Sequence, residues 1–538
     1  MNTIYHMNSP KQMLAVLNDL VSIKSITFAE EEKHVPLKVK QHLMQIPYFQ
    51  ENPSFIETHL TTDNRLFLTA LYQHKQAVKT IVLISHFDVV NIEDYGELKH
   101  LAFSPIELTK ELHRHKDDLP KLAKDDLESG EWLFGRGTMD MKCGLVQHMS
   151  LLEKAAMEDW KINLLLLTVP DEEVNSVGMR EAVPKLLELA ELHHLTYTLF
   201  LNSEPMFTQT PGDNDYYYYT GSIGKILPSA LCFGKETHVG EPFLGLNAAW
   251  MSAILSQEIE WNEKLCEHVN GEATPPPTLL WQRDLKKEYS VQIPHRSASM
   301  YNLFLMKRNP AEVMALMKEI AQDAAHKMEQ FIQQKFERFH IPPTQAETIT
   351  VITYEELRQY ACKKSSPEYI ASIENAVAKE RKGDNRMQSL TIVDQIAMSC
   401  QELAPMIVLY YAPPYYPAVN TRDHPMIESL AQSLTLYVEQ TFSHKLVPIQ
   451  YFNGISDLSY CTLQAPLSSM QTYDHNLPGD KELYDIPFNE MSQLTAPVLN
   501  VGPVGRDAHQ KTERLHLPFA FEQLPKILEH VVKAHKEQ

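Results

Sequence analysis

The sequence predicts an α/β protein: a three-layer αβα domain with a mixed, mostly parallel sheet, interrupted by an inserted α+β domain. Continuous apolar runs, rather than alternating ones, indicate strands that are covered on both faces. Helical patterns lie between these runs, and this alternation is typical of an α/β sheet. The pattern changes in the middle of the chain and later resumes, and 538 residues are enough for more than one domain.

The first part of the chain supplies the clearest strands and helices. Ser9 and Pro10 precede apolar residues at helical spacing, which predicts an amphipathic helix with a serine N-cap. A second helix is expected at about 36–44. Buried strands are predicted at 80–85, 162–169 and 197–201, and helices at 144–157 and 180–192.

The middle of the chain, from 215 to 418, is predicted to be the inserted domain. It contains expected strands, a Pro-rich loop at 274–277 and long helical patterns. The strands are predicted at 216–221, 224–233, 301–305 and 406–411, and the helices at 246–259, 311–336 and 363–385.

From about 421 the first pattern resumes, so the first domain is predicted to be discontinuous, with parts 1–214 and 419–538. This last part contains predicted helices at 424–441 and 519–535 and predicted strands at 447–452 and 497–501.

Composition excludes several classes of partner. The formal net charge is -20, whereas a nucleic-acid-binding surface is basic, so we expect no nucleic-acid partner. The longest strongly apolar run, 162–169, is too short to cross a bilayer, so we expect no membrane partner. Six scattered cysteines without a C-x-x-C pair and an N-terminus without a signal-peptide pattern predict a reduced, cytoplasmic protein.

Five segments carry acids and histidines in a fixed order, and most of them follow predicted strands. In open α/β sheets, ligands bind beyond the carboxyl ends of the strands, so these side chains are expected near one another. Together they offer a ligand set for two divalent metal ions with a carboxylate base beside them. The segments are Ser85–Asp88, Gly135–Lys142, Asp171–Glu173, Asn202–Pro205 and Gly502–His509.

Each segment also has an ordinary interpretation. His86 alone fits a loop histidine, with Asp88 able to accept its other ring N–H. Asp140 could bridge two metals or cap the helix that follows. Glu204 alone fits a solvated turn, and His509 a loop histidine. All of these interpretations would have to hold at once, which favours the metal site.

The acidic run at 171–173 suggests a division of labour. Carboxylates crowded at a buried strand end repel one another unless cations hold them. A solvated acidic turn is the alternative. If the run is part of the site, one of Glu172 and Glu173 binds metal while the other takes a proton from water.

On these residues the chain resembles the dinuclear zinc amidohydrolases and exopeptidases, which include glutamate carboxypeptidase, acetylornithine deacetylase and succinyl-diaminopimelate desuccinylase. The resemblance implies two Zn²⁺ ions, with Co²⁺ or Mn²⁺ as alternatives. It assigns Asp88 to the support of His86, Asp140 to the bridge and Glu172 to general-base catalysis. The implied metal ligands are His86, Asp140, Glu173, Glu204 and His509.

The insertion resembles the family's lid and dimerisation domain. The segment 234–248 resembles the lid signature, in which His238 would reach a neighbouring active site across a homodimer. Asn247, in the same lid segment, and Arg296 are predicted to bind substrate. Arg296 and Arg283 could pair with a substrate carboxylate, and the alternative is that both are ordinary exposed basic side chains. The segments 293–296, 302–304 and 454–458 are most similar to the arginine-utilisation, RocB-like branch. The insertion, at about 200 residues, is longer than the usual lid.

The expected activity is hydrolysis of an amide or peptide bond in a small N-acyl amino acid or a short peptide. The branch resemblance adds a role in arginine or amino-acid catabolism. Two alternatives stay open: an aminopeptidase that acts on longer peptides, and a non-catalytic, metal-binding regulatory dimer. The lid decides between substrates, and the lid is where this chain departs most from its relatives.

Overall fold

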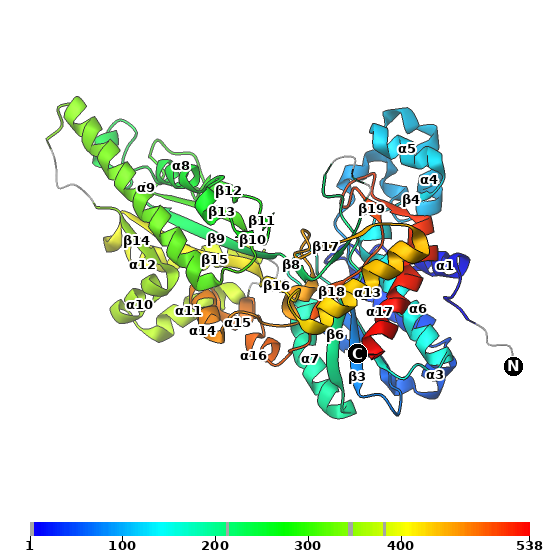
Figure 1. Ribbon diagram of the computed structural model, residues 1–538. Helices are drawn as coiled ribbons and strands as arrows, with labels where there is room; N and C mark the ends of the chain where they lie inside the picture. The colour runs from blue at the N-terminus through cyan, green and yellow to red at the C-terminus, as the bar shows by residue number, and fades with distance from the viewer. Residues whose placement is uncertain (1–4, 211–212, 214, 343–347, 380–383, 538) are drawn as a thin grey trace. The chain divides into compact units, whose positions relative to one another are not determined.

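A computed structural model describes residues 5–210, 213, 215–342, 348–379 and 384–537, and the chain divides into two compact units (Figure 1). The first unit comprises Met1–Ser222, Val419–Leu463 and Asn489–Gln538, and the second comprises Ile223–Ala418 and Gln464–Phe488. The helices of the first unit are α1 (Pro10–Val21), α2 (His34–Leu43), α3 (Pro47–Glu51), α4 (Pro105–Arg114), α5 (Lys121–Ser129), α6 (Cys143–Met157), α7 (Val177–His193), α13 (Pro425–Phe442) and α17 (Leu524–Glu537).

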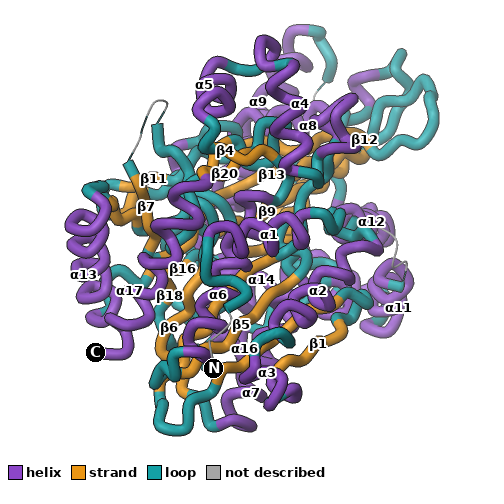
Figure 2. The backbone as a smooth tube through the Cα atoms, turned by 90° about the vertical axis from the view of Figure 1, so that its right-hand side faces the viewer, coloured by secondary structure: helices purple, strands orange, loops and turns teal. Residues whose placement is uncertain are grey.

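An eight-stranded mixed sheet forms the centre of the first unit, in the order β1-β2-β5-β3-β6-β18-β7-β17. The pairs β5–β3, β3–β6, β6–β18 and β7–β17 are parallel, and the remaining pairs are antiparallel. Figure 2 shows β5, β6 and β18 in this sheet. The strands are β1 (Ile56–Leu60), β2 (Leu66–Tyr72), β3 (Lys79–His86), β5 (Asn163–Val169), β6 (Thr196–Asn202), β7 (Tyr216–Tyr219), β17 (Leu446–Ile449) and β18 (Val498–Asn500).

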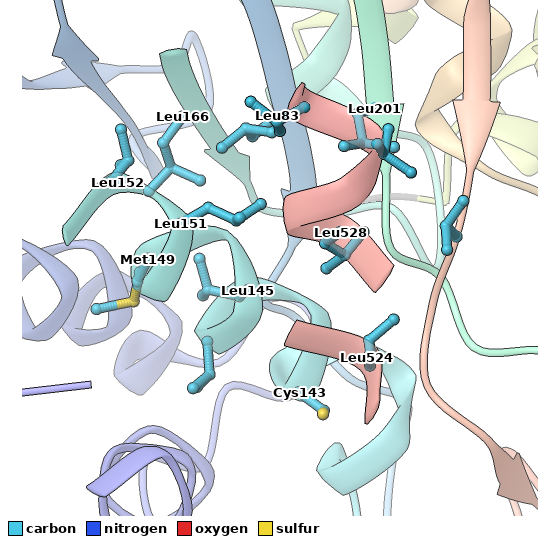
Figure 3. Close-up of a cluster of buried hydrophobic side chains, with 14 of the residues drawn as sticks. Leu83, Cys143, Leu145, Met149, Leu151, Leu152, Leu166, Leu201, Leu524 and Leu528 are labelled. Atoms are coloured by element: carbon cyan, nitrogen blue, oxygen red, sulfur yellow. The ribbon is translucent and has the colours of Figure 1, made fainter. Parts of the chain in front are cut away.

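Helices cover both faces of this sheet, as the continuous apolar strands predict. On one face, side chains of α6 and α17 pack against Leu83, Leu166 and Leu201 (Figure 3). The neighbouring residues Val82 and Leu165 point away from that cluster and are also buried. Helix α7 contacts β2 and β5. The predicted three-layer αβα arrangement is therefore confirmed.

Short strands complete the first unit beside the main sheet. One small sheet has the order β19-β20-β4 and another pairs β16 with β8. These strands are β4 (Trp132–Phe134), β8 (Gly221–Ser222), β16 (Val419–Asn420), β19 (Gly505–Arg506) and β20 (Arg514–His516), and the short helix α16 is Phe488–Met491.

The second unit is built on a five-stranded sheet in the order β12-β13-β9-β15-β14. Its pairs are antiparallel except β14–β15. Helices α8 and α9 lie on one face, and α10, α11 and α12 pack on the other in one apolar cluster (Figure 1). The elements are β9 (Gly224–Phe233), α8 (Ala248–Ile259), β10 (His268–Val269), β11 (Glu272–Ala273), β12 (Thr278–Asp284), β13 (Arg296–Leu305), α9 (Pro310–Arg338), β14 (Thr350–Thr353), α10 (Tyr354–Lys364), α11 (Pro367–Ala378), α12 (Asn385–Ser399), β15 (Met406–Tyr416), α14 (Leu467–Asn476) and α15 (Asp480–Leu483).

Some predicted elements differ from the structure. The single helix predicted at 363–385 is wrong, because α10 ends at Lys364 and α11 begins at Pro367, with Ser366 as its N-cap. Part of that prediction, 380–383, lies outside the described residues. The strand predicted at 406–411 continues to Tyr416, through two prolines. Several strands had no prediction, among them β1, β2, β4, β12 and β14.

The unit boundaries lie close to the predicted domain boundaries, with one larger difference. Gln464–Phe488, which we expected in the last part of the first domain, belongs to the second unit. In this segment Tyr473 stacks on Tyr411 and packs against Tyr415 of β15. The aromatic contacts join α14 to the second sheet, and no local pattern in the sequence indicates them.

Two findings concern membrane-spanning helices and disulfide bonds. Among the described residues, no helix combines the length and the apolar composition that crossing a lipid bilayer requires. All six cysteines have free thiols.

The buried His535 predicts a pH dependence of stability. Burial lowers its pKa to about 4, with a smaller contribution from Lys79, and its Nε2 lies 2.8 Å from the Thr198 hydroxyl. Between about pH 6.5 and 4 the unfolded chain binds a proton here that the folded chain does not, so stability falls as pH falls. We expect His535→Gln to remove about 1.4 kcal/mol per pH unit of this slope.

The measurement is urea unfolding at several pH values from 7 to 4.5. The control is His113→Gln, an exposed histidine on α4, which should leave the slope unchanged. Parallel stability curves for wild type and His535→Gln would contradict the prediction.

Candidate metal centre

Strand β3 places His86 at the carboxyl end of the main sheet, where its side chain is 1% exposed. The Nδ1 atom of His86 lies 3.1 Å from the backbone oxygen of Asp88 and 3.4 Å from its carboxylate. This contact orients the ring and leaves Nε2 to face the other acids. Asp88 also accepts the backbone N–H groups of Glu172 (3.0 Å) and Glu173 (3.3 Å). Asp88 therefore holds His86 and the segment 172–173 together.

Asp140 lies between the two candidate ligand histidines. It follows a tight turn at Gly137, whose φ of 74° suits glycine. Its Oδ1 lies 3.3 Å from Nε2 of His86, and its Oδ2 lies 3.2 Å from Nε2 of His509. Because the two oxygens face different histidines, the carboxylate has the geometry needed to bridge two cations.

Glu172 and Glu173 follow β5 and also face different histidines. The Oε1 atom of Glu173 lies 3.0 Å from Nε2 of His509. The Oε2 atom of Glu172 lies 4.0 Å from Nε2 of His86. The turn before them passes through Asp171 with φ of 73°. The two glutamates can therefore perform different tasks.

Glu204 follows β6 and completes the group around His86, with its Oε1 3.5 Å from Nε2 of that histidine. The backbone at Gly502 passes close to the backbone of Glu204 and holds it in place. A Cβ on Gly502 would lie 1.9 Å from the backbone oxygen of Glu204, so only glycine fits there. The Asn500 side-chain amide donates to the same oxygen at 3.3 Å.

His509 lies on the turn between β19 and β20, with φ of 64° and a side chain that is 47% exposed. The buried Glu513 connects this turn to the Asp140 loop. Its carboxylate accepts the Gly137 N–H at 2.7 Å and an Arg136 guanidinium N–H at 2.6 Å. Glu513 thus sets the spacing between two of the candidate ligands.

The predicted ligands form three overlapping groups whose donor atoms lie within 4.8 Å of one another. His86, Asp140 and Glu204 form one group, and Asp140, Glu173 and His509 form another. The third group is His86, Glu172 and Glu173. All five predicted metal ligands and the predicted base therefore come together, from segments more than 400 residues apart in the chain.

The electrostatics of the group suit added cations. Burial raises the pKa of Glu172 and Glu204 well above the usual range, although His86 opposes this. Burial lowers the pKa of His509, but hydrogen bonds to Asp140 and Glu173 outweigh it and raise the pKa to about 11. Crowded carboxylates and proton-holding histidines are the arrangement that divalent cations stabilise by replacing protons. The donor set therefore fits such cations.

Asp457 is a further acid at this site that we did not predict as a site residue. It begins a short helical turn after Ser456 and is 1% exposed. Burial raises its pKa to about 7, while His86 and Ser176 favour its charged form. It also raises the pKa of both Glu172 and Glu204. The segment 454–458 was noted only for its family resemblance, and nothing in its local sequence indicates this neighbourhood.

The three residues predicted in the insertion lie in the second unit. His238 is exposed, and its Nδ1 accepts the Gly240 N–H at 3.1 Å. The side-chain oxygen of Asn247 caps the first turn of α8. Arg296 donates to both carboxylate oxygens of Asp394, at 2.8 and 2.6 Å. Each of these residues therefore has a local partner within its own unit.

Comparison with known proteins assigns the chain to a family. The model of "Peptidase family M20/M25/M40" matches residues 82–473. "Uncharacterized protein YqjN" of Bacillus subtilis (strain 168) is 44% identical, over 98% of this chain and 97% of that protein. "Protein RocB" of the same organism is 28% identical, over 99% of this chain and 97% of its own length.

A solved structure shows the same fold. The M20 family metallo-carboxypeptidase Sso-CP2 from Sulfolobus solfataricus superposes with a TM-score of 0.57 at 12% sequence identity, covering 98% of this chain and 99% of that chain. The predicted family, including its relation to RocB, is confirmed. The chain belongs to peptidase family M20/M25/M40 and is a metal-dependent hydrolase of peptide or amide bonds.

Proposed function

We propose that this hydrolase cleaves the amide or peptide bond of a small N-acyl amino acid or a short peptide, with two bound zinc ions. The observation that carries the proposal is the position of Asp140, whose two oxygens face His86 and His509. Carboxylate and imidazole donors suit Zn²⁺, and Co²⁺ or Mn²⁺ could use the same ligands.

Each candidate ligand has a proposed place. His86 and Glu204 would bind one ion, and Glu173 and His509 the other, with Asp140 shared between them. The distances that support this pairing are 3.5 Å from His86 to Glu204 and 3.0 Å from His509 to Glu173. Asp88 would orient the His86 ring, as its contacts with Nδ1 indicate.

Glu172 is the proposed general base. When bound, the two ions would supply the charge that polarises a carbonyl group and acidifies water. Glu172 would take a proton from the attacking water and later give it to the leaving nitrogen, so that amide and water become a carboxylic acid and an amine. Its burial supports this role, since a raised pKa brings a carboxyl group closer to the working pH.

Residues of the second unit would decide the substrate. His238 would polarise the substrate carbonyl from the partner of a homodimer, and Asn247 and Arg296 would contact the substrate. Arg296 would then share its guanidinium between Asp394 and a substrate carboxylate. The similarity to RocB supports a role in arginine or amino-acid catabolism. The free thiols support a cytoplasmic location.

The proposed homodimer would form through the second unit. Strand β12 lies at the edge of its sheet and carries the half-exposed Leu280. Trp261, whose backbone N–H binds the residue just before β12, is 71% exposed. An edge strand with exposed apolar side chains favours pairing with another strand.

Metal content tests the ligand assignment. We expect two equivalents of zinc per wild-type chain, and loss of at least one equivalent in His86→Ala and in His509→Ala. The measurement is elemental analysis after dialysis against a weak chelator. The control is His516→Ala on β20, near His509 in sequence but facing Glu131 at 3.5 Å. Full zinc content in both ligand variants would exclude the assignment.

Turnover tests the role of Glu172. In a screen of N-acyl amino acids and short peptides, we expect Glu172→Gln to keep its zinc and to lose roughly 100-fold or more of kcat. Glu153→Gln, a buried glutamate that binds the backbone of Met7, is the control and should retain activity. Unchanged kcat in Glu172→Gln would rule out the proposed base.

The same screen, extended to longer peptides, separates the remaining functions. Products released only from the amino end of longer peptides would indicate an aminopeptidase. A zinc-loaded protein with no turnover on any substrate would indicate a binding or regulatory role.

Sedimentation velocity tests the dimer. We expect wild type to sediment at twice the chain mass of 61.8 kDa. Leu280→Asp should shift it to the monomer, because a charge at a sheet edge opposes strand pairing. Val78→Asp, at an exposed position of the first unit, is the control. A wild-type monomer at micromolar concentration would exclude this dimer.

A further inference from the structure

A buried arginine lies behind the candidate metal centre, outside every segment that the sequence singled out. Arg65 precedes β2 and is 5% exposed. Its guanidinium donates to Asp63 at 2.9 and 2.6 Å, and its Nη1 lies 2.9 Å from Oδ1 of Asp171 and 3.6 Å from Glu32. The Phe28 ring lies 4.7 Å below the guanidinium. These contacts hold the cation in one position.

Asp171 uses both of its carboxylate oxygens. The first pairs with Arg65, and the second accepts the Val177 N–H at 2.9 Å, at the start of α7. The backbone oxygen of Asp171 accepts N–H groups from Asn175 (3.2 Å) and Ser176 (2.6 Å). Its side chain is completely buried, and its backbone has φ of 73°. Asp171 is therefore the corner of a turn that ties β5 to α7.

This turn carries Glu172 and Glu173. Their backbone N–H groups are held by Asp88, which also contacts His86. The segment is thus fixed from two sides: Asp88 holds its amides, and the pair of Arg65 and Asp171 holds the corner before it. A corner at positive φ determines the direction in which the next two residues leave the strand.

We propose that Arg65 is a positioning residue for the reaction, acting through Asp171 to hold the turn that presents Glu172 and Glu173. This inference rests on the proposed function for its effect on turnover. Without Arg65, the buried carboxylate of Asp171 would lack its main counterion. The turn would then shift until Asp171 takes up a proton or contacts water. Small displacements of a catalytic group cost large factors in rate.

An arginine is required by this geometry. The planar guanidinium reaches Asp63 and Asp171 with different nitrogens in one fixed arrangement. A lysine ammonium is a single point charge and cannot repeat that pattern. Arg65→Lys should therefore restore the charge but only part of the positioning.

The test compares zinc-saturated wild type with Arg65→Met, Arg65→Lys and Asp171→Asn. The asparagine variant removes the charge, keeps an oxygen for the Val177 N–H and tolerates positive φ. It remains informative even if Arg65→Met does not fold. The control is Arg358→Met, which breaks a similar ion pair with the buried Glu374 in the second unit, at 2.7 and 2.9 Å.

We expect kcat to fall about 10- to 100-fold in Arg65→Met and Asp171→Asn, with KM changed less than about twofold. The kcat of Arg65→Lys should lie between those of wild type and Arg65→Met. In a further variant, Arg65→Ala, added guanidinium ions should restore part of the lost kcat. The control should keep wild-type kcat. Wild-type kcat in both Arg65→Met and Asp171→Asn would overturn the proposal, as would an equal loss in the control.

Hydrogen exchange separates this proposal from the proposed function. The backbone amides of 172–177 should exchange faster in Arg65→Met and Asp171→Asn than in wild type, and at the wild-type rate in Arg358→Met. If no chain hydrolyses any substrate but these amides exchange faster, the proposed function fails and the positioning role stands. Unchanged exchange in 172–177 overturns the positioning role whatever the activity.

Discussion

Repulsion among buried carboxylates is the constraint on which the first unit depends. Asp88, Asp140, Glu172, Glu204 and Asp457 are each at most 8% exposed and lie around one histidine. Acids in such an environment are stable only when hydrogen bonds, positive groups or cations offset their charge. The arrangement uses all three: backbone amides at Asp88, Arg65 at Asp171, and a donor set that fits two cations. Cations bound by this donor set would therefore also stabilise the fold.

The backbone shows where this arrangement is enforced. Positive φ angles at residues other than glycine are uncommon, and they cluster at functional sites. Asp171, Asp507 and His509 all have them, and each belongs to a turn that carries or follows a candidate ligand. Side-chain contacts hold two of these turns: Asp171 forms an ion pair with Arg65 and accepts the Val177 N–H, and Asp507 accepts the Thr512 hydroxyl at 2.7 Å. The Asp171 turn is thus held by a residue distant in sequence, Arg65, as well as by its own neighbours, whereas the Asp507 turn is held locally.

Much of the fold was predictable because the strongest signals are local. The apolar runs of β3, β5 and β6 and the N-cap Ser9 each depend on neighbouring residues only. Predictions failed where several weak local signals compete or where burial is provided by distant residues. The serine and proline at 366–367 end one helix and begin another, and α14 joins the second unit through contacts with residues far away in the chain, among them the aromatic contacts with β15.

The sequence by itself determined the chemistry that this protein can perform. It places acids and histidines at the ends of buried strands, and parallel strands bring such ends to one edge of a sheet. Only the tertiary structure decided which neighbours control those groups. Arg65, Glu513 and Asp457 have no local motif, because their importance comes from contacts with residues far away in the chain. A metal-ligating side chain can be recognised from its residue type and its position in the sequence. The residue that holds such a side chain in place is known only from the packing around it.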